Sequence, residues 1–148
     1  MPAGNLAELP GWAIELLRDG RVGHLGFLDG RDRPRVLPVT FALAGDRLYS
    51  AIDEKPKRVA GRELARIRYL RRRPDAAMTV DRYDDDWSHL AWVQVLGTVN
   101  VLDDPAARPE ALGALCAKYE SYRRRPPDGP LLELTPERAL HWRAAAGG

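Results

Sequence analysis

The chain is poor in cysteine and contains no long apolar run, and both absences narrow its class. Cys116 is the single cysteine, so no disulfide can form within the chain, and a reducing compartment such as the cytoplasm is expected. Its apolar surroundings favour a buried core side chain over a reactive thiol. No apolar segment approaches the roughly 20 residues that span a bilayer, and residues 1–9 lack the basic and apolar regions of a secretory signal. We therefore expect a cytoplasmic protein with no membrane partner and one domain over residues 1–148.

Several catalytic signatures are missing as well. His24, His89 and His141 have no metal-ligand spacing and no Cys/His cluster accompanies them, so no metal site is expected. The sequence contains no G-x-S-x-G, Walker or G-x-G-x-x-G motif. We interpret Asp84–Asp86 as a solvated acidic loop rather than a cation site. Because no nucleophile has a base beside it, we name no catalytic side chain and expect a cofactor that brings its own chemistry.

What is present is a series of short apolar segments separated by turn signals. Apolar spacing predicts helices at 5–18, 59–72 and 104–119. β-Branched and aromatic residues predict six strands, at 22–28, 35–43, 47–52, 76–80, 90–102 and 131–134. A final turn is predicted from Thr135-Pro136 to near Trp142. Because such short connections join antiparallel neighbours, we expect an α+β, mainly β fold: a six-stranded antiparallel split barrel with flanking helices.

Lysine is scarce, and two of the three lysines lie together. Lys55 and Lys57 stand beside Arg58, between a predicted strand that carries Ser50 and a predicted helix. Cationic side chains, a hydroxyl and backbone amides near a helix start suit a phosphate group, but the residues alone favour a solvated basic turn. The arginines within 62–73 spread around the helix axis instead of forming one stripe, so we expect no nucleic-acid partner.

Seven segments taken in order carry a family resemblance. They are His24–Leu28, Arg35–Phe41, Tyr49–Arg58, Ile67–Arg68, Pro74–Asp81, Tyr83–Trp87 and Trp92–Gly97. Together they resemble the pyridoxamine-phosphate-oxidase-like split-barrel family, and most closely its branch of deazaflavin (coenzyme F420)-dependent oxidoreductases. The Tyr-Asp-x-Asp-Trp loop before a long strand is among the most particular of these segments.

The resemblance implies a homodimer with two cofactor sites at its interface. In the family the second strand lies along the cofactor ring, a role that falls on Pro38, Val39 and Thr40. Arg35 stands where the family often places a basic group near the phosphate or ribityl chain. The residues implied for the phosphate are Ser50, Lys55, Lys57 and Arg58, and Ala51 is implied to line the cofactor site. Trp87 and Trp92 are implied to cover the ring from the partner subunit, and packing in the dimer core is their alternative role.

The implied activity is hydride transfer from a reduced deazaflavin to a small, apolar or conjugated molecule. FMN is the alternative cofactor, since both carry a ribityl phosphate. Thr40 replaces the lysine of the vitamin-processing oxidases, and Arg143 stands alone instead of in an arginine-rich C-terminal motif, so pyridoxamine phosphate oxidation is not expected. A non-catalytic carrier or sensor of the cofactor or of a tetrapyrrole is the alternative from another class.

Overall fold

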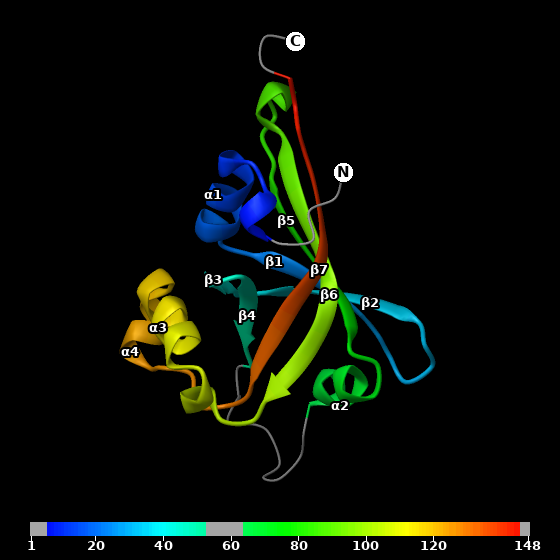
Figure 1. The fold of residues 1–148 in the computed structure, drawn as a ribbon, viewed down its shortest axis with the longest axis vertical. Coiled ribbons are helices and arrows are strands. Elements are labelled where there is room, and N and C mark those ends of the chain that lie inside the picture. The colour runs from blue at the N-terminus through cyan, green and yellow to red at the C-terminus, as the bar shows by residue number, and fades with distance from the viewer. Residues whose placement is uncertain (1–5, 53–63, 146–148) are drawn as a thin grey trace.

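A computed structural model describes residues 6–52 and 64–145 and shows one mainly antiparallel sheet with helices beside it (Figure 1). Its seven strands lie in the order β2-β1-β5-β6-β7-β4-β3. The strands are β1 (Gly23–Leu28), β2 (Pro34–Val39), β3 (Ala42–Ala44), β4 (Arg47–Ala51), β5 (Asp75–Arg82), β6 (Ala91–Leu102) and β7 (Leu131–Arg143). The predicted α+β split barrel is confirmed, with seven strands instead of six.

Four α-helices and three short 3₁₀ helices are present in the described residues. They are η1 (Leu6–Glu8), α1 (Gly11–Asp19), α2 (Ala65–Arg72), η2 (Trp87–His89), η3 (Pro105–Ala107), α3 (Pro109–Lys118) and α4 (Glu120–Arg124). Pro10 separates η1 from α1, and Pro109 begins α3, because proline cannot donate an intrahelical hydrogen bond. Within the described ranges, no helix has both the length and the apolar character that crossing a membrane requires.

The strand expected at 35–43 is two strands, because the chain bends at Thr40 and Phe41. β2 pairs with β1 and β3 pairs with β4, at opposite edges of the sheet. Only these two residues separate the two edge strands. The two edges therefore meet, and the sheet curls into a barrel that is split at this bend.

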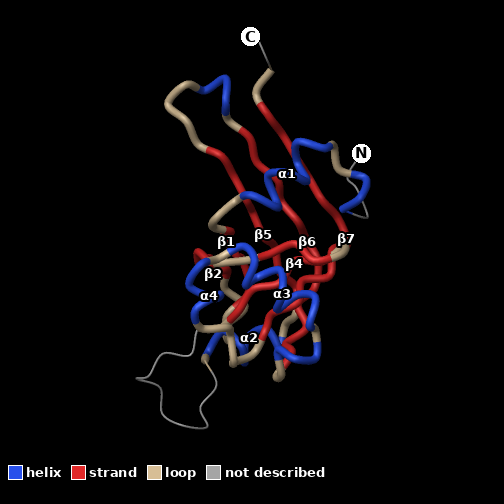
Figure 2. The backbone as a smooth tube through the Cα atoms, turned by 90° about the vertical axis from the view of Figure 1, so that its left-hand side faces the viewer, coloured by secondary structure: helices blue, strands red, loops and turns tan. Residues whose placement is uncertain are grey.

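The C-terminal strand is much longer than the sequence indicates. The sequence predicts a strand at 131–134 followed by a turn, but β7 continues to Arg143 beside β6. The ladder passes Pro136 through a register shift between Leu96 and Gly97, since a bulge tolerates a residue without an amide hydrogen. In Figure 2 the ends of β5, β6 and β7 extend together beyond the helices near the barrel.

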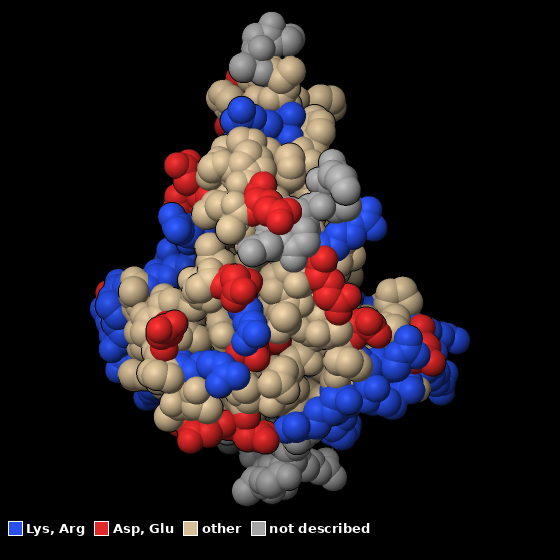
Figure 3. Space-filling view, viewed as in Figure 1, with Lys and Arg blue, Asp and Glu red and all other residues tan. Residues whose placement is uncertain are grey.

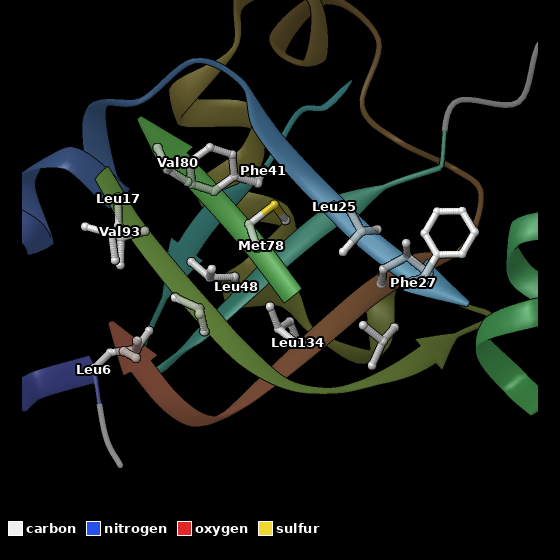
Figure 4. Packing of buried hydrophobic residues seen from close by; sticks show 14 of the residues in the cluster. Leu6, Leu17, Leu25, Phe27, Phe41, Leu48, Met78, Val80, Val93 and Leu134 are labelled. Carbon is white, nitrogen blue, oxygen red and sulfur yellow. The ribbon is translucent and has the colours of Figure 1, made fainter. Parts of the chain in front are cut away.

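The core lies on the inner face of the curled sheet (Figure 4). Residues paired directly across antiparallel strands share a face, and the row Leu37, Leu25, Met78, Val95, Ala139 points inward. Both α1 and α2 bury apolar side chains in this same core, Leu17 and Leu70 among them. The next row, Val36, Gly26, Ala77, Leu96, therefore lies on the outer face, where every member is at least partly exposed.

Candidate functional site

A cleft lies where the chain bends between β2 and β3. It has a volume of about 180 Å³ and is lined by Pro38, Val39, Thr40, Ser50, Ala51, Ile52, Arg66, Tyr122 and Leu132. β2 and β4 are far apart in the order of the sheet, yet the C-terminal ends of both line this cleft because the barrel closes here. Five residues implied by the resemblance thus come together: Pro38, Val39, Thr40, Ser50 and Ala51.

Hydrogen bonds from the side chains hold the wall of the cleft. The Ser50 hydroxyl, with its residue only 3% exposed, donates to the carbonyl oxygen of Thr40 over 2.7 Å. The Thr40 hydroxyl and the Tyr122 hydroxyl share a hydrogen bond of 2.6 Å. A serine hydroxyl carries one hydrogen, so Ser50 fixes the bend in β2–β3 and has no second hydrogen to donate to a ligand.

Tyr119, between α3 and α4, stabilises the bend between β2 and β3 by hydrogen bonds. Its hydroxyl oxygen accepts from the Phe41 amide at 3.1 Å, and the same hydroxyl lies 2.8 Å from the carbonyl oxygen of Arg21, to which it donates. Burial raises the pKa of the Tyr119 phenol further above neutral pH, so the hydroxyl keeps its hydrogen. The Tyr119 and Tyr122 rings meet edge to face at 5.5 Å. The spacing of three residues between Tyr119 and Tyr122, near a predicted helix end, is the signal in the sequence for this pair.

Arg66 brings a guanidinium group to the cleft from α2. Other arginines of this basic stretch pair with carboxylates: Arg71 with Asp103 at 2.6 Å, and Arg72 and Arg73 with Asp32 at 2.9 and 3.1 Å. Basic and acidic side chains accordingly meet along this edge of the molecule, at the lower right of Figure 3. Much of the positive charge that the sequence places here is compensated within the chain.

The remaining implied residues lie elsewhere. Arg35, on β2, has Nη1 3.8 Å from a carboxylate oxygen of Asp29. Trp87, on η2, is 69% exposed, and Trp92 on β6 pairs in register with Trp142 on β7. None of these three residues lines the cleft within one chain. The implied phosphate residues Lys55, Lys57 and Arg58 lie outside the described residues.

A buried carboxylate strengthens the barrel next to the cleft. Glu133 on β7 accepts hydrogen bonds of 2.8 Å from the Tyr49 hydroxyl and from Arg108 Nε. Burial acts to raise the pKa of Glu133, but these hydrogen bonds and the charges of Arg108 and Arg47 outweigh it and lower the pKa. The carboxylate is therefore ionised and ties β4, β7 and the start of α3 together.

Other chemistry is sparse in the parts of the chain that the structure describes. Histidine, cysteine and acidic side chains nowhere gather there in a group of three or more suited to a metal ion. Cys116, expected in the core, is half-buried on α3. Ile52, Arg66, Tyr122 and Leu132 are lining residues of the cleft that the sequence did not identify.

Solved structures share the fold with low sequence identity. A conserved hypothetical protein of Mycobacterium tuberculosis, Rv2991, matches 99% of this chain and 96% of its own length, with a TM-score of 0.71 and 15% identity. An F420 reductase matches over 89% of this chain and 98% of its own, with a TM-score of 0.65 and 23% identity. An FAD-binding protein of Mesorhizobium loti matches over 93% of this chain and 96% of its own, with a TM-score of 0.66 and 18% identity.

Sequence comparison points to the same family. No curated protein matches the chain. The family model described as pyridoxamine 5'-phosphate oxidase matches residues 12–140, which includes every described strand except the last three residues of β7. With this match and the split-barrel fold, the chain belongs to the pyridoxamine 5'-phosphate oxidase-like family.

Proposed function

We propose that the chain is an oxidoreductase that binds coenzyme F420, a deazaflavin, and transfers a hydride to a small conjugated molecule. One observation carries this proposal. Closure of the barrel assembles a cleft from Pro38–Thr40 and Ser50–Ile52, and most of these are the residues that the family resemblance implies for the cofactor. The solved F420 reductase of the same fold supports the choice of cofactor.

The side chains of the cleft suit a flavin-type molecule. Val39, Ile52 and Leu132 offer apolar surface for a ring system, while the Tyr122 hydroxyl and the Arg66 guanidinium offer donors for a ribityl chain and a phosphate. A bound deazaflavin would supply the reactive carbon and the hydride. The chain's own part is to orient the ring along the β2 backbone and to exclude water from the apolar wall.

The size of the cleft supports a second copy of the chain in the complete site. Its volume of about 180 Å³ lies below the roughly 300–1,000 Å³ of ordinary small-molecule sites. The outer face of β2 and β1 carries exposed apolar side chains, with Val36 64% exposed. A homodimer formed through this face would bury Val36 and bring the partner's surface toward the cleft. The partner's Trp87 and Trp92 are the residues proposed to cover the ring.

The test is direct binding of reduced and oxidised F420, and of FMN, to the purified protein. We expect F420 to bind more tightly than FMN, because its glutamyl tail adds carboxylates that can meet basic side chains. Arg66→Gln should weaken F420 binding by about tenfold or more, whereas Arg138→Gln, an exposed change on β7, should leave it unchanged. If FMN binds as tightly as F420 at low salt, FMN is the better assignment.

Turnover separates the enzyme from the non-catalytic alternative. Reduced F420 bound to the protein should stay reduced until a conjugated acceptor is added. Its oxidation by the acceptor is followed by absorbance. Tight binding without oxidation by any of a panel of enones, quinones and nitro compounds would favour a carrier or sensor. Loss of binding in Arg66→Gln with a native melting temperature would still place the cofactor in the cleft.

A further inference from the structure

A broad groove separate from the cleft lies between α1 and α3. Its volume is about 600 Å³, and it is lined by Arg18, Asp19, Arg21, Ala42, Leu43, Ala114, Ala117 and Lys118. In Figure 1, α1 and α3 stand on the same side of the sheet with β3 between them. Basic atoms gather on that flank, at the left of Figure 3. Three cationic side chains and one carboxylate thus surround a surface of small apolar side chains.

Lys118 is the unusual member of this groove. Its Nζ atom is buried and has no hydrogen-bond partner. The ammonium group lies 3.7 Å from the centroid of the Phe41 ring and 5.4 Å from that of Tyr119, and such contacts compensate only in part for lost hydration. Buried lysines are ordinarily paired, whereas the three hydrogens of the Lys118 ammonium have no acceptor among the described residues. Because the Nζ atom is buried against Phe41, the flexible side chain must turn toward the groove to meet an acceptor there.

We propose that this groove binds a small amphipathic organic anion, with its carboxylate on Lys118 and Arg21 and its apolar body over Ala42, Leu43 and Ala114. The cations select a negative group, and Arg21 can hold a carboxylate through two parallel hydrogen bonds. The alanines leave room for an apolar body, which an inorganic anion lacks. This site lies outside the cofactor cleft and does not depend on the proposed redox function.

The charge state of Lys118 makes the binding depend on pH. Burial, together with the charge of Arg21, lowers the pKa of Lys118 to about 8, although Asp19 acts in the opposite direction. The other charged groups of the groove are Arg18, Arg21 and Asp19, and burial raises the pKa of the Tyr119 phenol beside Lys118. A carboxylate binds the protonated amine, so the affinity should be highest below pH 8 and fall above it. By the same linkage, a bound carboxylate raises the pKa of Lys118.

Octanoate is the probe, and octanol, inorganic phosphate and two variants are the controls. By calorimetry on the full chain at pH 7, octanoate should bind far more tightly than octanol or phosphate. Lys118→Met keeps most of the side-chain volume and should weaken octanoate binding by about tenfold to a hundredfold. Arg138→Gln should leave it unchanged. The chain has only three lysines, at 55, 57 and 118, so selective ¹³C labelling resolves the titration of Lys118 by NMR.

The outcomes divide cleanly. A Lys118 midpoint near pH 8 that moves upward with octanoate, together with the loss in Lys118→Met, establishes the site. Equal binding of octanol overturns the role of the carboxylate, and equal binding of phosphate overturns the amphipathic class of ligand. If octanoate does not bind, or leaves the Lys118 titration unmoved, the proposal is wrong. The NMR titration uses the unaltered protein, so the result does not depend on how the variant folds.

Discussion

Replacing Gly97 by alanine tests whether the bulge between β6 and β7 depends on a missing side chain. A Cβ atom at Gly97 would collide with the carbonyl oxygen of Thr135 and would lie 2.9 Å from its carbonyl carbon and 3.1 Å from the Cα atom of Pro136. All three obstacles are backbone atoms, which cannot rotate away as a side chain can. The two strands must therefore separate locally and weaken the ladder that joins them.

We expect Gly97→Ala to destabilise the protein by about 3 kcal/mol, the upper end of the range for overpacking. In a chain of this size each 1 kcal/mol of lost stability lowers the melting temperature by about 2–4 °C. The melting temperature of Gly97→Ala should therefore be lower by about 6–12 °C. Differential scanning calorimetry measures this shift. Gly113→Ala is the matched control, because nothing lies within 4 Å of a Cβ atom there and alanine favours the helix by about 0.5–1 kcal/mol. A Gly97→Ala protein with the melting temperature of the wild type would refute the proposed clash with the backbone of β7.

Three further predictions concern the bend, the buried carboxylate and the outer face. Tyr119→Phe removes the hydroxyl that bonds the Phe41 amide and should cost about 1–3 kcal/mol in urea unfolding, whereas Tyr83→Phe, at an exposed ring, should cost nothing measurable. Glu133→Gln should be less stable than wild type at neutral pH. The folded pKa of Glu133 is lowered, so the difference in free energy of unfolding between the two proteins is largest above the unfolded pKa of about 4.3. This difference should shrink as the pH falls through the folded pKa. Val36→Glu should convert a dimer into a monomer by light scattering, and a wild-type protein that is monomeric at micromolar concentration would contradict the proposed interface.

Local signals were sufficient for the turns and for most elements. The Asp29-Gly30 pair marks the β1–β2 hairpin, where the Asp29 carboxylate accepts from the amides of Arg31 and Arg33 at 2.9 and 3.0 Å. Gly45 adopts a positive φ of 59° between β3 and β4, as a tight turn requires. These features depend on neighbouring residues, so the sequence predicts them directly.

Part of the candidate site was predictable from the family resemblance. Pro38–Thr40 and Ser50–Ala51 belong to two short segments that resemble the family, and both segments line the cleft. The sequence carries no comparable signal for Arg66 or Tyr122, which reach the cleft from helices remote in the chain. Their position at the cleft depends on how α2 and α4 pack against the sheet, and the spacing of residues within either helix does not predict it.

The sequence by itself determined the order of most helices and strands and the α+β class, because these depend on contacts between near neighbours. The two segments that line the cleft were predictable only through the family resemblance. Only the tertiary structure decided the length of β7 and the division of the strand at 35–43. Thr135-Pro136 indicates a turn when taken alone, but a partner strand of 12 residues with Gly97 opposite the proline extends the ladder past it. Likewise, Thr40 and Phe41 leave the strand because the edges of the sheet must meet there, which is a requirement of barrel closure and not of either residue.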